Sequence, residues 1–171
     1  MNTKNIALCG LMLSQIIVLS IIESLFPVFP FLPGIKLGLS NIVIMYSIFF
    51  MRKKYTILLA CFKSLFVFLT RGLTASLLSL GGGMASILII LVFILIFREK
   101  ISYITLSILG AIFHNIGQIT VLAIIIYSYN IFAYCPVLII SGIFLGAVTG
   151  TLLDAIMPAF KKIFNEPPRK R

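Results

Sequence analysis

A cluster of polar side chains lies inside one of the apolar segments of the chain, where hydrogen-bonding groups need a partner. The segment Gly110-Ala-Ile-Phe-His-Asn-Ile-Gly-Gln118 holds the chain's only histidine, an asparagine and a glutamine. On a helix His114 and Gln118 share a face, and Asn115 lies one step round. Polar groups at membrane depth are unfavourable unless they face a cavity, a ligand or a partner. The cluster therefore predicts either a wall of a binding pocket or interhelical hydrogen bonds that hold a bundle.

His114 has no recognisable partner for catalysis in the sequence. No Asp, Glu or Cys stands near it at metal-ligand spacing, and no Ser/His/Asp arrangement is evident. The cysteines at 9, 61 and 135 are scattered and form no CxxC pattern. We expect no catalytic residue, no metal site and no cofactor.

A second polar segment, Pro33-Gly-Ile-Lys-Leu-Gly-Leu-Ser-Asn41, precedes an apolar run. Its proline and glycines permit a tight turn that exposes backbone N–H groups at the start of a helix. A helix N-terminus beside Lys36 suits an anion, and Asn41 could orient it. The alternative is that Lys36 merely extends to the membrane interface.

Two further basic residues, Lys63 and Arg71, are eight positions apart, which is about two helical turns and so a similar face. Together they could line a basic path. Glu23, near the end of the first apolar segment, is the candidate counter-ion for these cations. A purely structural ion pair is as good an interpretation of Glu23 as ligand contact.

The segment from Arg71 to Ser86 is rich in small and hydroxyl residues and contains Gly81, Gly82 and Gly83 in succession. Regular helix is weakest there, and irregular backbone at membrane depth is tolerated where it is buried in protein or faces water. We expect a binding loop or gate at 81–83, with a plain flexible loop as the alternative.

Small residues recur at helical spacing in two other segments. Gly142, Gly146 and Gly150 form a stripe, and Gly10 with Ser14 forms a shorter one. Such stripes let another helix approach closely, either within the chain or in a partner. Both possibilities stay open from the sequence.

The composition identifies the elements that must position these residues. The 171 residues are 61% hydrophobic and 11% charged, with a mean hydropathy of +1.19, far from a soluble domain. Hydropathy predicts an all-α, polytopic membrane protein with about six transmembrane helices in one bundle, at about 5–26, 38–51, 55–70, 77–97, 102–128 and 136–158, of which the second and third are the least secure. We expect one membrane domain at 1–160 and a basic cytoplasmic tail at 161–171.

The net charge of +10 is explained by topology. Eleven of the fourteen Lys and Arg residues fall on one side of this arrangement, which places both termini in the cytoplasm of a bacterial-type cytoplasmic membrane. Because they form no stripe with interleaved aromatics, nucleic acid is not an expected partner. Lys36 and Arg71 then lie on the outer side, where the positive-inside rule disfavours them, and a ligand would account for that placement.

The order of these motifs resembles the Gx transporter family. The resemblance rests on Glu23, the 33–41 and 110–118 segments, the basic third segment and the 79–86 segment, and covers about residues 5–160. Members of that family are also labelled heptaprenyl diphosphate synthase component I and are similar to the substrate-binding S components of energy-coupling factor transporters. The resemblance implies partners: coupling and ATPase subunits, or a separate prenyl synthase subunit.

The sequence bears on whether the chain is a transporter component or itself a prenyl synthase. A catalytic prenyl synthase holds magnesium through aspartate-rich motifs, because hard cations prefer carboxylate oxygens. Asp154 is the chain's one aspartate, and there is no nucleotide-binding motif. We therefore expect a protein that is not itself an enzyme.

The leading hypothesis is an S-component-like, lipid-embedded subunit for a small, anionic or amphipathic solute. In it, Lys36 and Arg71 attract the solute, and Lys63 extends this basic path. Residues 41, 114, 115 and 118 orient the solute, and 81–83 gates the pocket. The alternatives are a noncatalytic membrane subunit assisting polyprenyl diphosphate synthesis and, with no motif in support, a component of extracytoplasmic redox or flavin handling.

Overall fold

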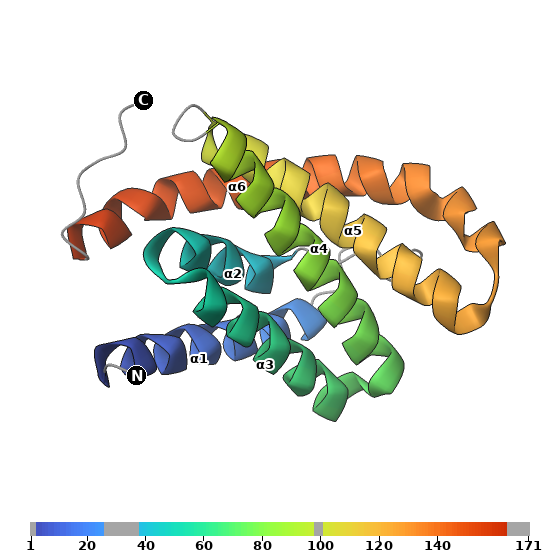
Figure 1. The fold of residues 1–171 in the computed structure, drawn as a ribbon, viewed down its shortest axis with the longest axis horizontal. Coiled ribbons are helices and arrows are strands. Elements are labelled where there is room, and N and C mark those ends of the chain that lie inside the picture. The colour runs from blue at the N-terminus through green and yellow to red at the C-terminus, as the bar shows by residue number, and fades with distance from the viewer. Residues whose placement is uncertain (1–2, 26–37, 98–100, 164–171) are drawn as a thin grey trace.

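The chain folds into helices throughout the parts that the structure describes. The computed structural model describes residues 3–25, 38–97 and 101–163, with side chains for 5–25, 38–97 and 101–158. The elements are α1 (Thr3–Leu25), α2 (Leu39–Phe50), α3 (Lys53–Arg71), α4 (Leu73–Phe97), α5 (Tyr103–Ile126), the 3-10 helix η2 (Tyr129–Tyr134) and α6 (Cys135–Ile163) (Figure 1). The all-α prediction is confirmed for these residues, and helix α6 continues into the segment expected to be a tail.

Helix ends fall within two residues of the predicted ones except at the start of α4 and the end of α6. The sequence predicted a connection of several residues after Arg71, but Gly72 alone joins α3 to α4. Gly72 has φ 86°, a conformation that favours glycine. Its N–H donates to the Phe68 carbonyl at 3.0 Å, and its own carbonyl accepts from the N–H of Ser76 at 3.2 Å. One left-handed residue is therefore enough to reverse the chain between two helices.

The expectation of irregular backbone at residues 81–83 is wrong, because α4 is continuous through all three glycines. Each glycine is about 1 kcal/mol less favourable in a helix than alanine. The compensation is close packing on α5: a Cβ on Gly81 would lie 2.4 Å from Val121 Cγ2, and one on Gly117 would lie 2.7 Å from the Gly81 carbonyl oxygen. The glycine run is a contact surface between two helix backbones.

The glycine stripe of α6 lies against α5. A Cβ on Gly146 would be 2.7 Å from Ile108 Cα, and one on Gly150 would be 2.7 Å from Ile104 Cα. Of the two interpretations that the sequence left open, this stripe serves packing within the chain. Gly10 differs, since a Cβ there would meet nothing within 4 Å, and Ser14 beside it is exposed.

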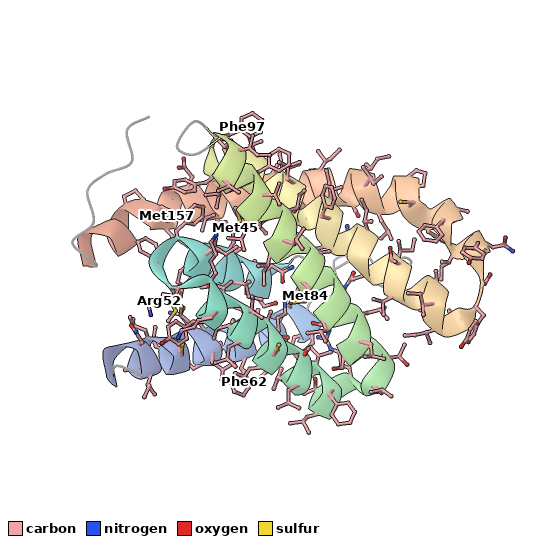
Figure 2. The ribbon with its side chains drawn as sticks, in the orientation of Figure 1. Met45, Arg52, Phe62, Met84, Phe97 and Met157 are labelled. Carbon is pink, nitrogen blue, oxygen red and sulfur yellow. The ribbon has the colours of Figure 1, made fainter. Side chains whose placement is uncertain are left out.

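Helix α2 lies between the other helices and contributes most to the core. Residues 42–47 of this short helix are all buried. They pack with α1, α3, α4 and α6, and Met45 of α2 and Met157 of α6, labelled in Figure 2, belong to the same buried cluster. In Figure 1, α2 lies between α1 and α6. The polar ends of α2 are thereby held near the middle of the molecule.

Four helices, α1, α4, α5 and α6, contain stretches long and apolar enough to cross a membrane. Their outward side chains are large and apolar, as at Leu88, Leu95 and Ile140, which are 65%, 74% and 68% exposed. Such a surface suits lipid better than water. The length and apolar surface of these helices identify the chain as a membrane protein. Helix α2, at about 18 Å for 12 residues, is shorter than the roughly 30 Å hydrocarbon core.

The α4–α5 contact makes a direct prediction for stability. Gly117→Ala should lower the free energy of unfolding by about 1–3 kcal/mol, because the new methyl group would meet the α4 backbone. Reversible SDS unfolding followed by circular dichroism measures this. The control is Gly10→Ala, which has open space and should be neutral or stabilising by at most about 1 kcal/mol. Equal effects of the two substitutions would contradict the close packing.

Candidate functional site

A cavity of about 300 Å³ lies inside the bundle, and all six α-helices contribute to its lining. Most of the polar residues that the sequence singled out face it, although they come from four different helices. These are Glu23, Asn41, Lys63, Arg71, His114, Asn115 and Gln118. Gly83 also lines it, whereas Gly81 and Gly82 stand behind it in the α4–α5 contact.

The carboxylate of Glu23 binds the start of α2. One oxygen accepts a hydrogen bond from the Gly38 backbone N–H, and the other accepts from the Ser40 hydroxyl at 3.4 Å. Glu23 is only 7% exposed, and Gly38, with φ 73°, turns the chain into the helix. The first turn of a helix favours an anion. The anion predicted for this helix start is therefore supplied by the protein itself.

Lys63 of α3 contacts the same first turn of α2. Its ammonium group, on a side chain only 8% exposed, donates to the Asn41 amide oxygen. Residues 38–41 thus donate hydrogen bonds to Glu23 and accept one from Lys63. Opposite charges held on one short segment in a medium of low dielectric stabilise each other.

Arg71 is the last residue of α3 and lines the cavity about 12 Å along the helix axis from Lys63. It is partly buried, and within the described parts of the chain its guanidinium makes no hydrogen bond or ion pair. Both basic residues of α3 therefore line the cavity.

The polar cluster of α5 also lines the cavity and packs on glycines. A Cβ on Gly82 would lie 2.9 Å from His114 Cε1 and 2.8 Å from Gln118 Cγ, so that only glycine leaves room for both side chains. Asn115 donates from Nδ2 to the Leu138 carbonyl at 2.8 Å and thereby also joins α5 to α6. Asn115 therefore lines the cavity and also makes an interhelical hydrogen bond.

Several hydroxyl groups that the sequence analysis did not single out complete the lining. Ser107 and Thr149 are buried and hydrogen-bonded to each other at 2.9 Å between α5 and α6. Ser20 lies one turn before Glu23, and Ser107 one turn before Gly110, so helical spacing from the chosen residues would have found them. The other hydroxyl residues of the lining are Ser40, Ser79 and Ser86.

Some expected site residues do not join this group. Lys36 lies outside the described residues, as does most of the predicted basic tail, 164–171. Gly10 and Ser14 lie on an exposed part of α1 and do not line the cavity. The lining glycine of α6 is Gly142, where a Cβ would come 3.2 Å from Asn115 Nδ2.

These features define a class: an all-helical membrane protein whose bundle contains a cavity with charged and polar groups in its lining. A family model described as heptaprenyl diphosphate synthase component I matches residues 12–156. The chain belongs to this family, which confirms the resemblance under that label. No curated protein and no solved structure matches it.

Removing the Glu23 carboxylate should destabilise the fold. Glu23→Ala leaves the Gly38 N–H without its acceptor and should lower the free energy of unfolding by about 1.5–3 kcal/mol. Glu23→Gln keeps an acceptor and should lose less. The control, Ser24→Ala, removes an exposed hydroxyl bonded to its own helix and should change stability by less than about 0.5 kcal/mol. The same unfolding assay would reject the anchoring role if Glu23→Ala matched Ser24→Ala.

Proposed function

We propose that this chain is a noncatalytic, integral membrane subunit that binds a small, anionic or amphipathic solute in the cavity of its bundle. The observation that carries the proposal is the gathering of Lys63 and Arg71 opposite the polar side chains of α5 around one internal space. Intramembrane ionisable residues are costly and commonly mark a solute pathway. This arrangement supports a role like that of a transporter's substrate-binding component.

The size and chemistry of the cavity support a small solute. Ligand pockets usually span about 300–1,000 Å³, and this one, at about 300 Å³, is at the lower end. Charged, amide and hydroxyl groups line it on several helices. A long prenyl tail needs a larger space, so the size of the cavity favours a compact ligand.

The alternative follows from the family name, which implies a separate prenyl synthase component as the partner. In this role the chain would be an accessory membrane subunit of polyprenyl diphosphate synthesis. Its single aspartate, Asp154, argues against magnesium-dependent catalysis by the chain itself in either role. The cationic side of the cavity would then meet a diphosphate group.

We further propose that transport requires coupling and ATPase subunits from other chains. The α6 glycine stripe is covered by α5, so it is not available for docking them. The open surface at Gly10 and Ser14 is the remaining small-residue stripe for a partner helix.

Identification of the bound solute tests the proposal. The full-length protein, purified in lipid nanodiscs, should carry a small water-soluble compound detectable by mass spectrometry after denaturation. Lys63→Met should reduce its amount at least about tenfold, because Glu23 would be left as an uncompensated negative charge that repels an anionic solute. Lys53→Met, at an exposed position outside the cavity, is the matched control.

The possible results of this experiment separate the candidates. A prenyl diphosphate in place of a small solute would favour the accessory role. A protein that carries neither, or an equal solute load in Lys63→Met and Lys53→Met, would contradict a solute-binding cavity.

We propose that the six helices form a multi-pass arrangement with both termini in the cytoplasm of a bacterial-type membrane. A green fluorescent protein fused after Arg171 should fluoresce, and alkaline phosphatase at the same point should be inactive, because each reports one side of the membrane. Phosphatase inserted after Tyr129, between α5 and α6, should be active. The reverse pattern would overturn the orientation and place Arg71 on the cytoplasmic side.

A further inference from the structure

The charged side chains around the cavity do not balance. Among the described residues that line it, Lys63 and Arg71 are basic and Glu23 is the one carboxylate. A charge inside the membrane is strongly unfavourable unless another charge or several hydrogen bonds compensate it. One positive charge therefore lacks a counter-ion among these residues.

The structure indicates which cation is already balanced. Glu23 accepts hydrogen bonds from the Gly38 N–H and the Ser40 hydroxyl, and Lys63 donates one to the Asn41 amide oxygen. Both charged groups are therefore hydrogen-bonded to residues 38–41. Both side chains are more than nine-tenths buried. They compensate each other within the fold.

Arg71 has the geometry expected of the group that meets a ligand. It stands about two turns further along α3, it is less buried than Lys63, and its guanidinium has no ionic partner among the described residues. A guanidinium binds a carboxylate or phosphate oxygen pair with two parallel hydrogen bonds. Its position at the end of α3 leaves it accessible at one end of the cavity.

The α5 side contributes hydrogen bonds but no fixed charge. Asn115 and Gln118 are neutral amides, and together with His114 they line the cavity. These groups suit an uncharged polar portion of a ligand.

We infer that the cavity selects a solute with a single negative charge, whose anionic group pairs with Arg71 and whose neutral polar part faces His114 and Gln118. This inference rests on the proposed function and names its substrate class. A diphosphate, with several negative charges, would bring more charge than the described lining residues compensate, so we expect it to bind more weakly. A neutral solute would leave Arg71 uncompensated.

Probes that differ only in charge test this selection. The full-length protein in nanodiscs is titrated calorimetrically with nicotinate, nicotinamide and quinolinate, which carry one, no and two negative charges on the same ring. A second set is phenylacetate, phenylacetamide and phenylmalonate, and inorganic diphosphate is added as a polyanion. In at least one set, the monoanion should bind about tenfold more tightly than its neutral and dianionic relatives, and diphosphate should bind more weakly than that monoanion.

Charge substitutions should move this preference in opposite directions. Arg71→Gln should remove the advantage of the monoanion over the neutral amide. Glu23→Gln, which keeps an acceptor for Gly38, should shift the preference towards the dianion because one negative charge has gone. Arg52→Gln, at an exposed position outside the cavity, is the charge-matched control and should leave the preference unchanged. Circular dichroism checks that each variant is folded.

The results separate this inference from the proposed function. Preference of the unaltered protein for a dianion, a neutral amide or diphosphate overturns the inference and leaves solute binding intact. An unchanged preference in Arg71→Gln also overturns it. If no probe binds, the net charge of the co-purified solute decides: one negative charge supports the inference and any other charge overturns it. If no solute co-purifies either, both proposals fail.

Discussion

The close approach of α4 and α5 is the contact on which the rest of the site depends. Glycines on both helices bring the two backbones together, with a Cβ on Gly117 blocked by the Gly81 carbonyl. The same run provides, at Gly82, the space into which His114 and Gln118 fit. Small residues let helices associate in lipid, where the hydrophobic effect supplies no driving force between them. Here they also set the position of one polar side of the cavity, so stability and site geometry have a common origin.

The second constraint is the placement of charge in a medium of low dielectric. The first turn of α2 supplies two donors to Glu23 and, through Asn41, an acceptor to Lys63. A short helix that cannot span the hydrocarbon core by itself thus becomes the point where charges from α1 and α3 are neutralised. Its burial among the other helices is consistent with that role, since its polar end needs partners that lipid cannot offer.

Much of this arrangement follows from the sequence. Charged clusters and prolines mark the helix ends, and polar residues inside apolar segments mark the lining, because each is costly unless the fold compensates it. Three features required the three-dimensional structure. Gly81, Gly82 and Gly83 have low helix propensity, and only the neighbouring helix explains their regular conformation. The sequence predicts Glu23 as a counter-ion, and the structure adds its hydrogen bonds to Gly38 and Ser40, 15 and 17 residues away.

The third feature is the shared role of Asn115, which lines the cavity and binds the Leu138 carbonyl. The residue types of this cluster are the same for a ligand site and for a helix contact. Which of these two roles applies depends on the helix that packs against the cluster, and the residue pattern of one helix does not reveal its neighbour. For the glycine stripe from Gly142 to Gly150, the structure identifies this neighbour as α5.

The one-residue connection at Gly72 has a consequence for how the chain enters the membrane. Helix α3 carries Lys63 in its middle, and a lysine at the centre of a helix disfavours insertion by about 2.5–3.5 kcal/mol. Helix α4, with a hydropathy of 2.7, follows after a single residue. In the proposed multi-pass arrangement, the two helices would enter the bilayer as one hairpin, in which the strongly apolar α4 offsets the unfavourable transfer of Lys63. The charge beside the cavity would then depend on a neighbouring helix already during synthesis.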